Sequence, residues 1–111
     1  MSSERRKFER VAVPESAGIH LSRGSKTMGP VCMLGHGGLL IHTEQKFKKG
    51  QKLTVVLADD AKTVSRRIPA VVRYARSGET GFEFVKLDAE TAIDIGVLIG
   101  RVLPKKKAAQ A

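Results

Sequence analysis

Three arginines near the beginning of the chain, Arg5, Arg6 and Arg10, are the residues best suited to chemistry. A guanidinium presents a planar fork of donors that pairs bidentately with phosphate oxygens and stacks flat on purine rings, which a lysine ammonium cannot do. Arg6 and Arg10 are four residues apart, so both side chains can lie on one side of an extended segment or of a helical turn. The segment is therefore suited to grip one phosphate-bearing ligand. The alternative is a solvated basic tail that binds nothing in particular.

A glycine cluster, Gly35-His36-Gly37-Gly38, follows further along the chain. Glycines permit positive φ angles and let the backbone approach a neighbour or a ligand closely, so this stretch is expected to be a tight connection between two strands. His36 would lie within that connection, whereas His20 and His42 are most simply strand residues.

The residue pattern indicates neither catalysis nor a metal site. The three histidines share no metal-ligand spacing with acidic residues, and the sequence has no Ser/His/Asp or paired-carboxylate arrangement. The single cysteine, Cys32, excludes an internal disulfide and a Cys-based zinc site, and its neighbours Val31 and Met33 indicate a buried, inert thiol. We therefore expect no enzyme, no resident metal and no cofactor.

Composition narrows the class of protein. A chain of 111 residues with 41% hydrophobic and 28% charged residues is expected to form one domain with a packed core. Its net charge of +9 predicts attraction to polyanions without choosing among them. Because the chain has only one Tyr, four Phe and no Trp, stacking of successive nucleic-acid bases is disfavoured. With no apolar run long enough for a membrane span and no signal-peptide core, we expect a cytoplasmic protein.

The hydrophobic pattern predicts mostly β structure. The first expected strand runs from Arg10 to Leu21 and is interrupted near Pro14. Pro69 favours an edge position or a bulge in the fifth strand. Short strands separated by glycine-bearing turns are typical of an antiparallel barrel or sandwich. The other expected strands are Val31 to Leu34, Leu39 to Thr43, Leu53 to Leu57, Val64 to Tyr74 and Gly81 to Leu87.

A helix is expected after the last strand. Asp88 can cap its first turn, and apolar residues recur with helical period until Pro104 ends it. Gly96 and Gly100 cost about 1 kcal/mol each in a helix relative to Ala, so we expect them where the helix lies close to the barrel. The predicted organisation is a flexible arginine-rich ligand-binding segment at 1–10, a barrel with its helix at 11–104, and a basic tail at 105–111.

Five segments carry a family resemblance: Glu4 to Val11, Gly37 to Ile41, Phe47 to Leu53, Ala70 to Tyr74 and Thr80 to Val85. In this order and spacing they resemble the PilZ domain family, bacterial receptor modules for the second messenger cyclic di-GMP. The resemblance implies a six-stranded barrel with a C-terminal helix, and it places Arg6 and Arg10 in the family's RxxxR element. In this family an arginine directly before that pair, here Arg5, accompanies binding of an intercalated dimer of the nucleotide.

The second ligand motif of the family, Asp/Asn-x-Ser-x-x-Gly, is only partly present. The aligned residues are Met33 to Gly38, and Gly38 alone matches. In the family the acidic or amide side chain and the serine hydroxyl bind guanine, so Met33 and Gly35 remove two hydrogen-bond partners. At about 0.5 to 1.5 kcal/mol each, this loss weakens binding roughly tenfold to a hundredfold. Backbone groups around Gly35, or the imidazole of His36, could replace part of it.

Arg73 occupies a position from which some family members add a further ligand contact. The simpler interpretation is an exposed strand residue.

Three functions remain open. The first is a receptor that binds cyclic di-GMP through Arg5, Arg6 and Arg10 and relays the signal to a protein partner. The second is a degenerate adaptor that no longer binds the nucleotide and serves protein interaction, for example in motility or surface-organelle assembly. The third, nucleic-acid binding by a small basic barrel, rests on the net charge and on Lys105 to Lys107, and ranks well below the other two.

Overall fold

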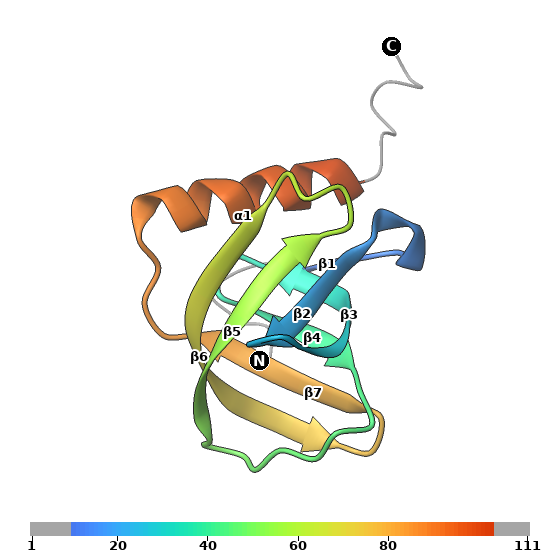
Figure 1. Cartoon of the computed structure of the whole chain (residues 1–111), viewed down its shortest axis with the longest axis vertical. Helices are drawn as coiled ribbons and strands as arrows, with labels where there is room; N and C mark the ends of the chain where they lie inside the picture. The colour runs from blue at the N-terminus through green and yellow to red at the C-terminus, as the bar shows by residue number, and fades with distance from the viewer. Residues whose placement is uncertain (1–9, 104–111) are drawn as a thin grey trace, which may run out of the picture.

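The computed structural model describes residues 10–103. Seven strands, one short 3-10 helix and one α-helix follow one another along this part of the chain (Figure 1). The strands are β1 (Arg10–Ala12), β2 (Ile19–Arg23), β3 (Lys26–Gly35), β4 (Gly38–His42), β5 (Lys52–Asp59), β6 (Ser65–Arg76) and β7 (Glu79–Phe84); the 3-10 helix is η2 (Glu15–Ala17) and the α-helix is α1 (Ala89–Val102).

Six of the strands close into an antiparallel barrel. Hydrogen-bonded neighbours follow the order β3, β2, β5, β6, β7 and β4, and the pairing of β4 with β3 completes the ring. Strand β1 pairs with β3 alone, along Met33 to Gly35 and beyond the stretch of β3 that pairs with β2. The predicted six-stranded barrel with a C-terminal helix is thus confirmed, with β1 as a short seventh strand.

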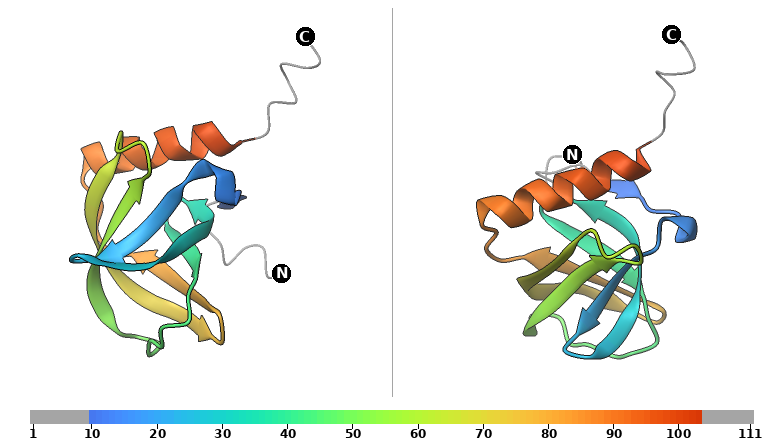
Figure 2. Two further views of the ribbon diagram at one scale, coloured as in Figure 1. Left: turned by 45° about the vertical axis from the view of Figure 1, so that its right-hand side comes forward. Right: turned by 45° about the horizontal axis from the view of Figure 1, so that its top comes forward.

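Alternating side chains fill the barrel. In β5 the residues Leu53, Val55 and Leu57 are buried and the residues between them are more exposed, as the two-residue period of a strand requires. Helix α1 lies across one end of the barrel (Figure 2) and closes it with the fully buried side chains of Ile95 and Leu98. One hydrophobic core therefore holds the barrel and the helix together.

Polar contacts fix the helix in place. Asp88 caps it as predicted, because its carboxylate accepts a hydrogen bond from the backbone N–H of Thr91 at 2.8 Å. Arg66 of β6 pairs with Asp94 at 2.6 Å, and Arg101 near the helix C-terminus pairs with the buried Asp59 of β5, also at 2.6 Å. The two ion pairs join opposite halves of the helix to two neighbouring strands.

The strand containing Pro69 differs from its prediction. Strand β6 has a neighbour on each side, so the edge position expected for Pro69 is wrong. Pro69 lies one residue before the first pair between β6 and β7, Ala70 with Phe84, and its carbonyl oxygen accepts from the N–H of Val85 at 2.9 Å. Its missing N–H therefore falls just beyond the end of the β7 ladder, where it is tolerated.

The two helix glycines also differ from each other. A Cβ at Gly96 would lie 3.5 Å from the imidazole Nε2 of His36, so Gly96 does lie close to the barrel. A Cβ at Gly100 would meet nothing within 4 Å among the described residues. The expectation of close packing is therefore wrong for Gly100. The predicted interruption near Pro14 is confirmed, since η2 separates β1 from β2.

Candidate ligand site at the β3–β4 turn

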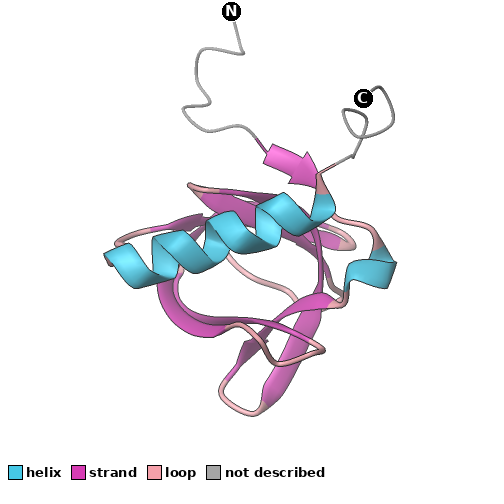
Figure 3. Ribbon diagram, turned by 90° about the horizontal axis from the view of Figure 1, so that it is seen from above, coloured by secondary structure: helices cyan, strands magenta, loops and turns pink. Residues whose placement is uncertain are grey.

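Strand β1 brings Arg10 beside the glycine turn. Arg10 stands directly opposite Gly35 in the antiparallel pairing of β1 with β3, although the two residues are far apart in the sequence. The backbone bond from the Val13 N–H to the Cys32 carbonyl oxygen, at 2.9 Å, continues this pairing. Figure 3 shows β1 at the margin of the barrel, next to α1. Arg10 is exposed there, and Arg5 and Arg6 lie outside the described residues.

The turn itself consists of His36 and Gly37, between the end of β3 and the beginning of β4. Gly38 follows and pairs with Glu83 of β7, where a Cβ would collide with the carbonyl oxygen of Phe82. A glycine is therefore required at this position by close backbone approach.

Gly35, Gly37 and Gly38 do not adopt the positive φ angles that glycine permits. The described glycines with positive φ lie elsewhere, at Gly18, Gly24, Gly29, Gly50 and Gly78. At Gly38 the glycine serves close backbone approach instead.

His36 is exposed at the tip of the turn and faces the helix at Gly96. Met33 is half-buried and stands opposite Leu40 on one side and Ala12 on the other. At the position that aligns with the acidic or amide residue of the second ligand motif, this chain therefore presents a thioether, which is at most a weak acceptor.

Arg73 lies on β6, two strands away from the turn, and is not free. Its Nε donates to the Glu83 carboxylate at 2.5 Å, and the side chains are 62% and 53% exposed. Arg73 is the extra residue where the β6–β7 register shifts between Val72 and Tyr74. Because Glu83 is also the partner of Gly38, Arg73 is connected to the turn through Glu83. The sequence interpretation missed Glu83, although its exposed position between Phe82 and Phe84 is a visible signal.

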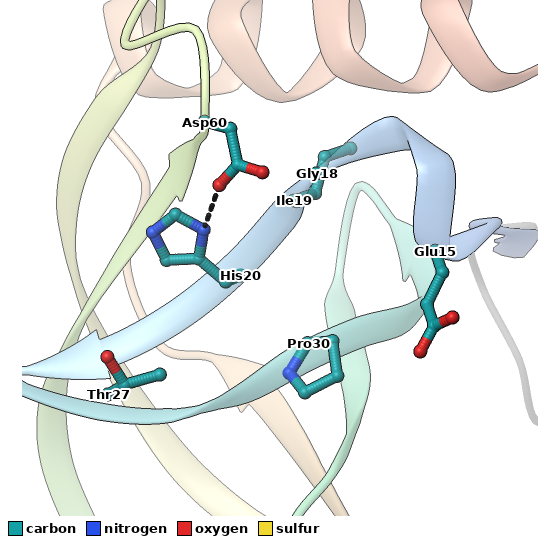
Figure 4. A pocket seen from close by; sticks show the side chains of 7 residues that line it. All are labelled: Glu15, Gly18, Ile19, His20, Thr27, Pro30 and Asp60. Atoms are coloured by element: carbon teal, nitrogen blue, oxygen red, sulfur yellow. Dashed lines mark ion pairs between the residues drawn. The ribbon is translucent and has the colours of Figure 1, made fainter.

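A separate pocket of about 370 Å³ lies between β2, β3 and the β5–β6 loop (Figure 4). Its lining carries Glu15 and Asp60, and the imidazole Nδ1 of His20 is 3.4 Å from an oxygen of Asp60. None of the residues predicted to bind ligand lines it. Two carboxylates make this pocket unsuited to an anionic nucleotide, so the β3–β4 turn with Arg10 is the better candidate.

The family model for the PilZ domain matches residues 4–101. The chain belongs to the PilZ family. PilZ domains are receptors for cyclic di-GMP and are generally non-catalytic modules. A comparison with curated proteins finds no match. No helix within residues 10–103 is long and apolar enough to cross a membrane.

Solved structures show the same fold. The PilZ protein YcgR of Escherichia coli, solved in complex with cyclic di-GMP, is 12% identical with a TM-score of 0.71, over 96% of this chain and 48% of that one. The Bacillus subtilis inhibitor of motility, MotI/DgrA, is 16% identical with a TM-score of 0.66, over 87% of this chain and 50% of that one. An uncharacterized Legionella protein is 13% identical with a TM-score of 0.64, over 90% of this chain and 99% of that one. This chain thus corresponds to about half of YcgR and of MotI/DgrA.

Proposed function

We propose that this PilZ domain binds cyclic di-GMP through Arg5, Arg6 and Arg10 beside the β3–β4 turn. The observation that carries the proposal is the pairing of Arg10 with Gly35, which puts one arginine of the RxxxR element next to the turn that follows it in the family pattern. The family match supplies the ligand class.

The chemistry follows from the donors. Cyclic di-GMP carries two phosphodiester charges and two guanines, and guanidiniums can neutralise the former and stack on the latter. Met33 and Gly35 offer no side-chain partner to the guanine edge, so the arginines carry most of the binding energy. Selectivity for guanine over adenine is correspondingly reduced.

Transmission to a partner involves the helix in this proposal. His36 lies at the ligand turn and next to Gly96 of α1, so a ligand that moves His36 also changes the surroundings of the helix. Closure of the segment before Arg10 over the nucleotide would add a second changed surface, and ordering a segment is an established way to switch a protein. The partner is then a protein that recognises this end of the barrel.

Calorimetric titration tests the proposal. We expect cyclic di-GMP to bind the full chain with measurable heat, cyclic di-AMP to bind less tightly by a small factor, and GTP to bind weakly. Arg10→Ala should abolish the heat, whereas Arg23→Ala, at the exposed turn between β2 and β3, should leave it unchanged. Absence of heat and of any thermal shift at tens of micromolar nucleotide would overturn the proposal.

The second candidate is an adaptor that does not bind the nucleotide, and Met33 and Gly35 in the second ligand motif favour it. The two functions predict different effects of substitutions in cells that depend on this protein. If Arg6→Ala and Arg10→Ala together leave its cellular function intact, while serine in place of the exposed Ile93 and Val97 of α1 destroys it, the adaptor is correct.

A further inference from the structure

Three side chains with metal-binding atoms meet on the barrel away from the ligand turn. The thiol of Cys32 on β3, the imidazole of His42 on β4 and the carboxylate of Glu79 on β7 have donor atoms that all lie within 4.8 Å of one another. Strand β4 begins at the ligand turn with Gly38 and ends at His42, so the cluster and the turn lie at opposite ends of this strand.

Strand register creates the cluster. His42 and Glu79 are directly opposite in the pairing of β4 with β7. Cys32 is the extra residue where the register between β3 and β4 shifts from Val31 to Met33, and its thiol donates to the carbonyl oxygen of Leu40 at 3.4 Å. A bulge re-aims a side chain in this way and is often found next to a functional site.

The donor set matches a borderline-soft divalent cation. Thiolate, imidazole and carboxylate are the ligands that Zn²⁺ takes in proteins, at about 2.3, 2.0 to 2.1 and 2.0 to 2.2 Å. Tetrahedral geometry at those lengths requires donors about 3.5 Å apart. Small rotations of the side chains would close the remaining gap, because His42 is exposed and Cys32 and Glu79 are only half-buried.

The surrounding groups are compatible with a cation. The Tyr74 hydroxyl donates to a Glu79 oxygen at 3.3 Å, as an outer partner that orients a ligand carboxylate would. Arg76 is the register partner of Glu79 in the pairing of β6 with β7, and its guanidinium carbon lies 4.9 Å from the centre of the Tyr74 ring.

We propose that Cys32, His42 and Glu79 form a three-ligand site for Zn²⁺ or a similar divalent cation on the outer face of the barrel. The exposed side of His42 leaves a fourth position for water, so the site is of the open type. A bound cation would join β3, β4 and β7 to one another. Spacing along the chain does not predict the cluster, because its members come from three strands and meet only through the barrel pairing. The proposal therefore departs from the sequence expectation that a single cysteine excludes a Cys-based zinc site. It does not depend on nucleotide binding.

Cobalt titration tests the site in the full chain under reducing conditions. Co²⁺ should produce a thiolate-to-metal charge-transfer band that Zn²⁺ removes by competition. Free Zn²⁺ at a hundred times its Kd should raise the Tm by about 10 °C. Binding should weaken as the pH falls, because the thiol and imidazole must be deprotonated to ligate.

Substitutions distinguish a three-ligand metal site from metal binding by the Cys32 thiol alone. His42→Gln and Glu79→Gln should each raise the Kd for Co²⁺ at least about tenfold. Loss of a residue that only supports a metal ligand already weakens metal binding by about this factor, and loss of a ligand itself should cost no less. Cys32→Ser should remove the band. His20→Gln, at the histidine paired with Asp60, should change nothing. Metal-free Tm values show whether each variant is folded. Absence of a band from the folded wild type, or a band whose Kd is the same in His42→Gln and Glu79→Gln, overturns the proposal.

Discussion

The ion pair between Asp59 and Arg101 should contribute a measurable part of the stability, and Arg101→Met removes it while keeping an apolar stem. Asp59 is only 2% exposed, and Arg101 donates to its Oδ2 at 2.6 Å. Asp59 also accepts from the Thr63 hydroxyl at 2.6 Å and from the Val64 N–H at 3.0 Å. After the substitution the carboxylate keeps these two bonds and loses its cation.

The expected cost follows from that geometry. Removing one partner of a fully buried pair costs about 3 to 5 kcal/mol. Arg101 is 42% exposed, and two hydrogen bonds to Asp59 remain, so the cost should be closer to that of one charged hydrogen bond, about 1.5 to 3 kcal/mol. For a domain of this size that corresponds to a Tm lower by about 6 to 13 °C.

Urea unfolding at neutral pH measures this difference, with Arg23→Met at an exposed turn as the matched control. Burial tends to raise the pKa of Asp59, but the hydrogen bonds from Thr63, Arg101 and Val64, together with the charge of Arg101, lower it well below its usual range. A lowered pKa means that the stabilisation is full above about pH 5 and declines progressively at more acid pH. The gap between wild type and Arg101→Met should therefore narrow below pH 5. A loss under 0.5 kcal/mol at neutral pH, or a gap that widens in acid, would refute the reasoning.

Three further outcomes are expected. Gly38→Ala should destabilise the barrel by about 1 to 3 kcal/mol in urea unfolding, because its Cβ collides with backbone, whereas Gly100→Ala should stabilise by about 0.5 to 1 kcal/mol; equal effects would contradict the close approach at Gly38. Glu83→Gln should release Arg73 and tighten cyclic di-GMP binding a few-fold by calorimetry, and adding Arg73→Ala should reverse the gain; an unchanged Kd would mean that Arg73 takes no part. Met33→Asn should tighten binding by about 2-fold to 13-fold through one added hydrogen bond, and a weaker complex would place the guanine elsewhere.

Local patterns were sufficient to predict most of the fold. Apolar residues at every second position, Leu53, Val55 and Leu57, predict a half-buried strand. Asp88 as a capping residue predicts the start of α1, and the helical period of the apolar residues after it predicts the buried face of the helix. These features depend on residues near one another in the chain. The choice of a six-stranded barrel over a sandwich came from the family resemblance.

Features that depend on pairing between distant segments were not predictable in the same way. A register shift, such as those at Cys32 and Arg73, leaves little trace in hydrophobic periodicity, because the bulged strand remains apolar on its inner face. The consequences are the engagement of Arg73 by Glu83 and the cluster that contains Cys32. At Gly100 a local pattern gave a wrong prediction. The cost of glycine in a helix suggested close packing against the barrel, but a Cβ at this position would meet no neighbour within 4 Å among the described residues.

The location of nucleotide binding is the central claim, and backbone amide chemical shifts of the full chain during titration with cyclic di-GMP test it most directly. The account predicts shifts confined to β1, residues 33–38 and the adjoining part of α1 around Gly96, and their absence in Arg10→Ala. Shifts centred on the pocket of Glu15, His20 and Asp60, or no shifts at saturating nucleotide, would contradict it.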